Sequence, residues 1–336
     1  MKAAIAGVSY YLPDHVLTNE QLADEFPDWN SSKIEAKTGI RERHIAAEQE
    51  FASDLAVAAA RKLFQAGIAA PQDIDYLLLC TQSPDYFLPT SACLVQERLN
   101  LRTDCGALDF NLGCSGFVYG LGLAKGLIET GQARNVLLIT AETYSKHIHQ
   151  GDKSVRTIFG DAAAATLVQG TQSERVRLGP FVYGTDGRGA KNLIVPTGGM
   201  RTARLQDAPV IEDASANKRT VNNLYMNGAE IFNFTLKAVP ESVSKLLSIA
   251  GMAMDEIDLF LFHQANAYML EHLKRKLNIA DDRMPIMMSH CGNTVSSTIP
   301  VLLKDLEMAG KLHRGQRLML LGFGVGYSWG GCIVNW

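Results

Sequence analysis

The chain has 336 residues, of which 47% are apolar and 20% are charged, a composition typical of a globular protein with a sizeable core. Its net charge of −3 argues against a general nucleic-acid-binding protein, which needs a basic surface. No run approaches ~20 apolar residues, so the sequence predicts no membrane span and no membrane partner. The six cysteines are scattered without a C-x-x-C pair, which predicts no metal site and indicates reduced thiols in a cytoplasmic protein.

The first segments of the chain predict strands. MKAAIAGVSYYLP (1–13) combines apolar residues with a terminal proline and predicts a first strand. Further on, AGIAAPQDIDYLLLCTQSPD (66–85) contains a helix end at Ala-Gly, a polar turn and the apolar run DYLLLC. This run is too short for a helix and lacks alternation, so it predicts a central strand covered on both faces.

Residues 109–131, DFNLGCSGFVYGLGLAKGLIETG, place a cysteine ahead of an almost uncharged run. After Cys114 only Lys125 and Glu129 carry charge, so the run predicts a helix over 115–130 that is buried on nearly every side. Close approach of this helix to a neighbour would be allowed by its glycines, Gly116, Gly120 and Gly122.

Cys114 has two interpretations. Most buried cysteines are inert core residues. At a helix N-terminus, however, free N–H groups and a partial positive charge favour the thiolate, which predicts a reactive thiol of lowered pKa. The order Gly113-Cys114-Ser115-Gly116 differs from the G-x-nucleophile-x-G elbow, which argues against an α/β-hydrolase.

The chain repeats its own pattern. AGMAMDEIDLFLFHQANA (250–267) resembles 66–85, and the helix–glycine–strand order of 114–142 returns at 294–324. Helix ends at Ala-Gly are common enough for such similarity to arise by chance. Two pairs in the same order nevertheless favour two similar βα halves, 1–172 and 173–336.

The repeat predicts that helices 115–130 and 295–309 are equivalents related by a pseudo-twofold axis. Cys114 would begin the first helix, Asn293 would precede the second, and His263 would follow the strand DLFLF. In an α/β fold ligands bind at such strand ends and helix N-termini, so the three residues would share a site. Taken singly, a histidine here is also typical of a core or cap residue, and an asparagine of a turn with a helix cap.

Several motifs carry a resemblance to a known family. In chain order they are VSYYLP, KTGIRERHIAAE (37–48), CSGF, IFGDAAAA (158–165), HQAN, GNT and GFGVGYSWGG (322–331). With these motifs, which extend over nearly the whole chain, the sequence resembles the β-ketoacyl-acyl carrier protein synthase III family of the thiolase superfamily. The resemblance implies an α/β, thiolase-like fold whose two halves stack in layers, α-β-α-β-α. It also implies a homodimer.

The resemblance assigns chemical roles to residues of this sequence. An acyl group would pass from a thioester of CoA or carrier protein to Cys114. A malonyl thioester on acyl carrier protein would then lose CO₂ and condense with it. His263 and Asn293 would stabilise the enolate, and the backbone N–H groups of Cys114 and Val325 would hold the acylation oxyanion. No cofactor is implied, because the CoA or phosphopantetheine thioesters are substrates.

Further residues would contact the substrate. By the resemblance, the pantetheine arm would run past Asn266 and Gly228, and Lys37 and Lys153 would face the CoA nucleotide. Phe323 would also contact substrate. Because lysine lacks the bidentate fork of arginine, an acyl carrier protein is an alternative to CoA as the acyl donor.

Two surface features concern partners. By the resemblance, Leu88 in DYFLPTSAC (85–93) would reach across the dimer and close the partner's acyl pocket. The basic helix LKRKLNI (273–279) predicts docking of an acidic carrier protein, although a charge run is also typical of a solvated face. The docking residues would be Lys274, Arg275 and Lys276.

The leading hypothesis is therefore an acyltransferase that initiates fatty-acid synthesis by decarboxylative condensation. An alternative of the same fold is a specialised acyltransferase of secondary or surface-sugar metabolism that forms a C–C bond, an ester or an amide. An alternative of another class is a non-catalytic or thiol-redox protein in which Cys114 is structural. The sequence leaves the acyl donor and acceptor open.

Overall fold

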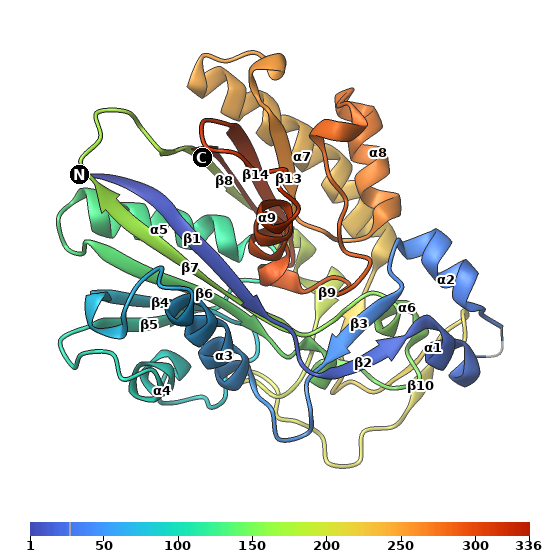
Figure 1. The fold of residues 1–336 in the computed structure, drawn as a ribbon. Helices are drawn as coiled ribbons and strands as arrows, with labels where there is room; N and C mark the ends of the chain where they lie inside the picture. The colour runs from blue at the N-terminus through green and yellow to red at the C-terminus, as the bar shows by residue number, and fades with distance from the viewer. Residues whose placement is uncertain (27) are drawn as a thin grey trace.

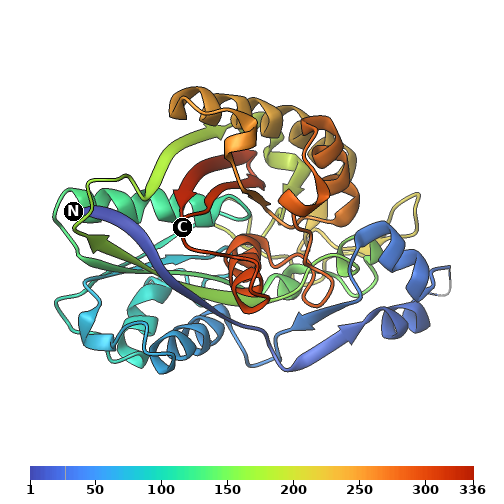
Figure 2. The same ribbon diagram turned by 45° about the horizontal axis from the view of Figure 1, so that its top comes forward.

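Two β-sheets, separated and covered by helices, make up the molecule (Figure 1). The computed structural model describes residues 1–26 and 28–336. The layers alternate as helix, sheet, helix, sheet and helix, and Figure 2 shows them with α7 and α8 in orange at the top. The predicted α-β-α-β-α order is confirmed.

The first sheet is built from strands within residues 2–171. Its order is β1 (Lys2–Tyr11), β7 (Ala162–Thr171), β6 (Asn135–Glu142), β4 (Tyr76–Cys80) and β5 (Gly106–Phe110). β4 pairs in parallel with β5 on one side and β6 on the other, so the predicted central position of DYLLLC is confirmed. β5 forms the edge of the sheet beside β4.

The second sheet is built from strands within residues 178–335. Its order is β13 (Leu259–Phe262), β14 (Arg317–Gly324), β15 (Ser328–Asn335) and β8 (Leu178–Thr185). DLFLF resembles DYLLLC in sequence, and this similarity predicts a central strand for it as well. Within the described part of the chain β13 pairs only with β14, so that prediction is wrong. All four of its residues are nevertheless buried. An unbroken apolar run indicates that both faces of a strand are buried. It does not determine whether the strand lies at the centre or at the edge of its sheet.

Shorter elements lie outside the sheets. The short strands pair as β2 (His15–Thr18) with β3 (Glu42–Ile45), β9 (Leu193–Ile194) with β12 (Tyr225–Met226), and β10 (Ile211–Glu212) with β11 (Lys218–Arg219). The α-helices are α1 (Asn19–Glu25), α2 (Ser31–Thr38), α3 (Ala52–Gln65), α4 (Ser91–Arg98), α5 (Gly116–Glu129), α6 (Lys153–Arg156), α7 (Gly228–Ala250), α8 (Ala267–Leu277) and α9 (Thr298–Met308). The 3₁₀ turns are η1 (Pro71–Asp73), η2 (Tyr144–His147), η3 (Gly187–Asn192), η4 (Met254–Glu256), η5 (Asp281–Arg283) and η6 (Val295–Ser297).

The helices divide among three layers. α3 and α4 cover the outer face of the first sheet, α7 covers the second sheet, and α8 packs on α7. α5 contacts strands of both sheets, and α9 contacts β1, β7 and β13, so these two helices form the middle layer (Figure 1). The two helices predicted to be equivalents thus lie in the same layer. Their pseudo-twofold relation and the boundary between 172 and 173, which falls between β7 and β8, stay predictions.

α5 approaches both sheets closely through its glycines. A Cβ on Gly120 would lie 2.5 Å from Cδ1 of Leu138 in β6, and one on Gly116 would overlap a β4 side chain. On the opposite side, a Cβ on Gly122 would overlap the Tyr183 hydroxyl of β8. The predicted close approach is confirmed at all three positions.

α7 is a 23-residue helix with one buried face. It ends at Gly251, whose φ of 63° is in the left-handed region that glycine adopts without strain. Neither α7 nor any other helix within residues 1–26 and 28–336 is long and apolar enough to cross a membrane.

The packing of α5 predicts whether each of two glycine substitutions stabilises or destabilises the fold. Gly120→Ala should lower the free energy of unfolding by about 1–3 kcal/mol, because Leu138 must move to admit the methyl group. Gly126→Ala on the same helix is the control, since a Cβ there meets nothing within 4 Å, and it should stabilise by about 0.5–1 kcal/mol. Chemical denaturation measures both changes. Equal effects of the two substitutions would contradict the close packing at Gly120.

Candidate active site

Cys114 lies between the end of β5 and the start of α5, where it is 5% exposed. Strand β14 passes directly beside it. A Cβ on Gly324 would lie 2.9 Å from the Cys114 sulfur. The hydroxyls of Ser115 and Ser328 are 2.6 Å apart and join the start of α5 to β15. Cys114 is therefore held at the junction of the two sheets.

His263 follows β13 directly and is 2% exposed. Its backbone N–H donates to the Leu321 carbonyl at 2.9 Å, and its Nδ1 is 2.7 Å from Oγ1 of Thr298. The Phe323 ring meets the imidazole edge-on, with centroids 5.5 Å apart. Burial lowers the pKa of His263 to about 3, so the imidazole is neutral at physiological pH.

Asn293 is fixed by its backbone and by its side chain. Its N–H donates to the Ile158 carbonyl at 2.9 Å, and its Oδ1 accepts a hydrogen bond from Val295 N–H at 2.9 Å. Its Nδ2 donates to the Ala265 carbonyl at 3.3 Å. An amide nitrogen carries two N–H groups, so one remains to donate to a substrate.

These three residues line one small cavity. It has a volume of about 70 Å³, and Cys114, His263, Asn293 and Phe323 all contribute to its wall. The structure thus brings together the predicted trio from β5–α5, the end of β13 and the loop before η6. Their catalytic roles stay predictions at this point.

The predicted lowering of the Cys114 pKa is wrong. Burial, followed by the nearby Glu142 carboxylate, raises its pKa to about 12. The helix N-terminus offers little compensation, because Gly116 N–H is already bonded to the Gly113 carbonyl at 2.7 Å. With its pKa raised in this way, the resting residue is a neutral thiol at pH 7.

A larger cavity of about 530 Å³ leads to the Cys114 cavity, and we call it the mouth. Its wall includes Lys37, Lys153, Gly228 and Asn266. The resemblance implies that these four residues contact the substrate, and that role stays a prediction. The mouth and the Cys114 cavity share four wall residues, Ile158, Met226, Gly228 and Asn266.

The mouth is shaped by local hydrogen bonds and ring contacts. Asn266 caps α8, because its Oδ1 accepts from Met269 N–H at 2.9 Å. Nothing lies within 4 Å of a Cβ built on Gly228, so this start of α7 leaves open space. The Lys37 ammonium lies 5.2 Å from the Trp29 ring centroid, which gives the mouth a cationic and aromatic rim.

The chain is similar to known proteins along nearly its whole length. The family described as 3-oxoacyl-[acyl-carrier-protein (ACP)] synthase III matches residues 108–187, and its C-terminal counterpart matches 247–336. The β-ketoacyl-[acyl-carrier-protein] synthase III of Clostridioides difficile strain 630 is 35% identical over 100% of this chain and 98% of its own length. The chain belongs to the β-ketoacyl-acyl carrier protein synthase III family.

Solved structures give the same family. A crystal structure of a 3-oxoacyl-(acyl-carrier-protein) synthase III is 57% identical and matches with a TM-score of 0.99 over 100% of both chains. A 3-oxoacyl-(acyl-carrier protein) synthase from Burkholderia xenovorans LB400 is 38% identical, with a TM-score of 0.89 over 99% of this chain and 94% of that one. The predicted thiolase-like fold of this synthase is therefore confirmed.

Leu88 lies away from the cavities that contain Cys114 and the mouth. It is 82% exposed, beside Tyr86 and Phe87 in the loop between β4 and α4. Within this chain it closes no acyl pocket, and its reach into a partner subunit stays a prediction.

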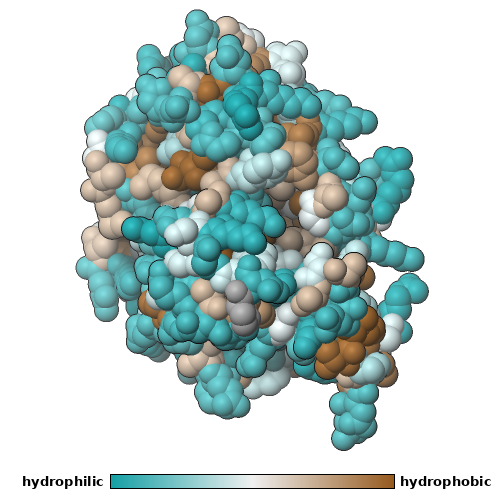
Figure 3. All heavy atoms as spheres, turned by 90° about the vertical axis from the view of Figure 1, so that its right-hand side faces the viewer, coloured by the Kyte–Doolittle hydropathy of each residue, from teal (hydrophilic) through white to brown (hydrophobic). Residues whose placement is uncertain are grey.

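Lys274 differs from the other predicted docking residues because it is paired within the fold, and its docking role stays a prediction. Its ammonium lies 2.8 Å from Glu271 and 2.8 Å from Asp281, and its side chain is 9% exposed, so it is neutralised within the fold. Arg275 and Lys276 are exposed on the same helix, and their docking role stays a prediction. Figure 3 shows that the face on the right of Figure 1, which carries α2 and α8, is covered mainly by hydrophilic side chains.

Sequence reasoning missed several polar residues that support the site. Thr298 contacts His263, and Gln82 and Tyr144 lie behind Cys114. Glu142 is fully buried, and burial raises its pKa to about 8. A charged residue at the end of the apolar run NVLLITAE was a signal that could have identified Glu142.

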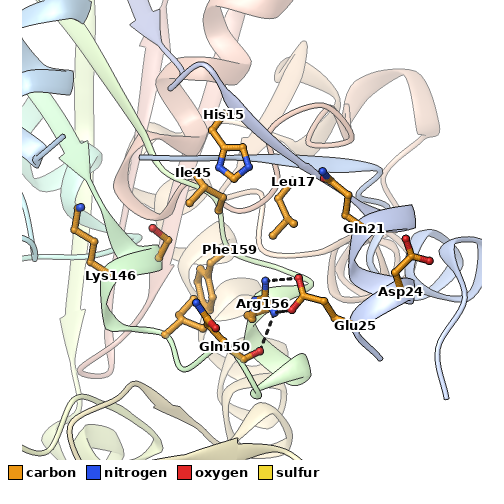
Figure 4. A pocket seen from close by; sticks show the side chains of 12 residues that line it. His15, Leu17, Gln21, Asp24, Glu25, Ile45, Lys146, Gln150, Arg156 and Phe159 are labelled. Atoms are coloured by element: carbon orange, nitrogen blue, oxygen red, sulfur yellow. Dashed lines mark hydrogen bonds and ion pairs between the residues drawn. The ribbon is translucent and has the colours of Figure 1, made fainter. Parts of the chain in front are cut away.

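A separate cavity of about 660 Å³ lies between β2, β3, α1 and α6 (Figure 4). Arg156 pairs with Glu25 across it and donates to the Gln150 carbonyl at 2.8 Å. These groups satisfy one another and tie α1 to α6. Because α6 begins at Lys153, this ion pair helps to fix one wall of the mouth.

The raised pKa predicts how Cys114 reacts with iodoacetamide. Only the thiolate is alkylated, so the rate at Cys114 should rise about tenfold per pH unit from pH 7 to 10 without levelling off. Peptide mass spectrometry measures the rate, and the exposed Cys93 serves as the control that should react faster at each pH. A plateau in the Cys114 rate below pH 9 would show that its pKa is low instead.

Proposed function

We propose that this synthase transfers an acyl group from a pantetheine thioester to Cys114 and condenses it with a malonyl thioester on acyl carrier protein. The observation that carries the proposal is the convergence of Cys114, His263 and Asn293 on one buried cavity that is joined to the mouth. The family membership favours this condensation over specialised transfer to oxygen or nitrogen and over a thiol-redox protein.

In the first step the Cys114 sulfur attacks the thioester carbonyl. A bond forms between this sulfur and the acyl carbon, the bond from the acyl carbon to the donor sulfur breaks, and the thiol proton leaves with the donor thiol. The oxyanion of the intermediate is held by the backbone N–H groups of Cys114 and Val325. Because the site is buried, such donors act in a low dielectric, where they stabilise charge more than in water.

In the second step the malonyl group loses CO₂. The electron pair of the broken C–C bond passes to an enolate whose oxygen accepts from His263 Nε2–H and from the free Asn293 N–H. The enolate carbon then attacks the acyl carbon, and the bond to the Cys114 sulfur breaks. This cleavage frees the β-ketoacyl thioester and leaves Cys114 as a thiolate, which takes up a proton from solvent and becomes a thiol again.

Thr298 decides whether His263 can donate at Nε2. A neutral imidazole has one N–H, so donation at Nε2 requires Nδ1 to accept. The Thr298 hydroxyl at 2.7 Å supplies a donor to Nδ1. The same oxygen is 3.2 Å from the Val295 carbonyl, so the shorter contact favours the tautomer with a proton on Nε2.

The donor enters through the mouth. Lys37 and Lys153 suit the phosphates of CoA or of a phosphopantetheine arm, and Gly228 leaves space for the arm beside Asn266. An acidic carrier protein would dock on the exposed Arg275 and Lys276, through charge that steers its approach. The cysteines at the described positions are free, which supports a reducing, cytoplasmic location.

The β4–α4 loop supports a homodimer. Tyr86, Phe87 and Leu88 are 62%, 79% and 82% exposed, a contiguous apolar surface that monomers rarely leave in water. β5 is the edge strand of the first sheet and has free pairing groups nearby. A second copy of the chain would cover this surface and bring Leu88 toward the partner's acyl pocket.

The division of roles can be tested with two variants. Cys114→Ser should abolish the acyl mass shift of the intact protein, because an alcohol lacks the acidity and nucleophilicity of the thiol. Asn293→Ala should still be acylated but should release CO₂ from a malonyl thioester about 10²–10³-fold more slowly. Cys93→Ser is the matched control and should acylate normally. Acylation of Cys114→Ser at the wild-type rate would falsify the assignment of the nucleophile.

The dimer contact predicts an effect on acyl choice. Leu88→Phe should shift the chain-length profile of Cys114 acylation toward shorter donors, and Leu88→Ala toward longer ones, by about 10-fold or more per methylene group. Sedimentation should show a weaker dimer for Leu88→Ala. The control is Met200→Ala, since Met200 is 95% exposed on a different loop. Identical profiles for all variants would mean that Leu88 does not line an acyl pocket.

A further inference from the structure

A fourth cavity of about 810 Å³, which we call the rear cavity, lies behind Cys114. Its wall includes Gln82, Asn111, Tyr144, His147, Leu193 and Val325, together with Tyr86 and Phe87 of the β4–α4 loop, so it borders the surface that we propose a second copy covers. Leu193 also lines the Cys114 cavity. A Cβ on Gly113, the residue before Cys114, would lie 2.6 Å from Gln82 Oε1 and 2.7 Å from Val325 Cγ1. The rear cavity is thus separated from the nucleophile by single residues.

The mouth and the rear cavity meet the Cys114 cavity at different residues. The mouth shares Ile158, Met226, Gly228 and Asn266 with it, whereas the rear cavity shares Leu193. A thioester that enters through the mouth therefore places its sulfur on the mouth side of Cys114. Its acyl group is left to extend toward the rear cavity.

The wall of the rear cavity nearest Cys114 carries neutral polar groups. Tyr144 is 4% exposed, and its hydroxyl donates to Gln82 Oε1 at 3.4 Å. The Gln82 amide in turn donates to Asn111 Oδ1 at 3.2 Å. Within the described residues, the second N–H of Gln82 and both amide N–H groups of Asn111 form no hydrogen bond, so donors remain for a ligand.

The rest of the wall carries uncharged groups beside the charged residues Asp85, Lys146 and Arg204. The His147 ring lies edge-on to the Tyr144 ring, with centroids 5.8 Å apart. Burial, followed by the charge of Arg204, lowers the pKa of His147, so its imidazole is uncharged at neutral pH. Lys146 also lines this cavity, but its ammonium donates to the carbonyls of Ala47 and Glu48 at 2.9 Å each.

We propose that the rear cavity selects a short acyl group that carries a hydroxyl or keto oxygen beyond its thioester carbonyl. This proposal rests on the proposed acyl transfer to Cys114. The oxygen accepts hydrogen bonds from the amide N–H groups of Gln82 and Asn111. A saturated acyl group displaces water from these N–H donors but offers them no hydrogen-bond acceptor. The site therefore discriminates against acyl groups that lack the oxygen.

The test is a competition among pantetheine thioesters for Cys114. Butyryl, 3-hydroxybutyryl, acetoacetyl and succinyl thioesters are mixed, and intact-mass spectrometry of the protein measures which acyl group is attached. We expect the 3-hydroxybutyryl or acetoacetyl group to exceed butyryl by at least about tenfold, the effect of roughly two neutral hydrogen bonds.

Two variants assign the preference to the polar wall. Tyr144→Phe and Gln82→Leu should each lower the ratio of 3-hydroxybutyryl to butyryl by about 3- to 10-fold. Tyr183→Phe is the matched control, because Tyr183 lies on β8 against α5, outside the rear cavity, and its ratio should equal that of the wild type.

Each possible result of the competition either supports or overturns the proposal. Equal attachment of butyryl and 3-hydroxybutyryl to the wild type overturns it, whether or not a variant folds. Dominance of succinyl overturns it in favour of recognition by the charges of Arg204 and Lys146. If no thioester of the panel acylates Cys114, while malonyl decarboxylation is also absent, the proposed function itself fails.

Discussion

The site depends on one close contact, between the start of α5 and β14. A Cβ on Gly322 would lie 2.5 Å from the carbonyl oxygen of Cys114, and one on Gly324 would lie 2.9 Å from its sulfur. Any side chain on these β14 positions would push the helix away from the strand. Because both are glycines, the second sheet closes on α5, while Gly116 and Gly120 allow the first sheet to close from the other side. Closure from both sides buries Cys114.

This burial sets the charge state of the reacting groups. Desolvation disfavours whichever form is charged, so it raises the pKa of Cys114 and lowers that of His263. At rest Cys114 is consequently a neutral thiol and His263 a neutral imidazole, so these two residues do not form an ion pair with each other. In the proposed reaction negative charge arises on the thioester oxygen and on the enolate, beside N–H donors that already have their positions, and on the Cys114 sulfur when its bond to the acyl carbon breaks. Donors that need no reorganisation contribute most to lowering such a barrier.

The sequence predicts the site best where the order of strands and helices along the chain determines which residues meet. Cys114, His263 and Asn293 follow or precede regular elements, and in an α/β fold such positions converge, so their meeting could be predicted. The charge states could not, because they depend on burial that the fold creates. In the sequence Lys274 resembles a surface cation, but in the fold its ammonium lies beside the carboxylates of Asp281 and Glu271. The rear cavity was also beyond prediction, since Gln82 and Tyr144 belong to separate loops that only tertiary packing brings together.

Glu142 joins the segments on which both steps of the reaction depend. Its Oε1 accepts from the Ser296 hydroxyl at 2.9 Å, just after Asn293, and its Oε2 accepts from the backbone N–H of Gln82 at 3.0 Å. One buried carboxyl group thus connects the loop that supplies an enolate donor to the loop that forms the rear cavity. It lies at the end of β6 in the first sheet, whereas Ser296 belongs to η6 ahead of α9. A shift of either loop would leave this carboxyl group buried and short of a hydrogen bond, which costs about 1–3 kcal/mol or more. The proposed acyl-binding wall and the proposed condensing residues are therefore connected through the same carboxyl group.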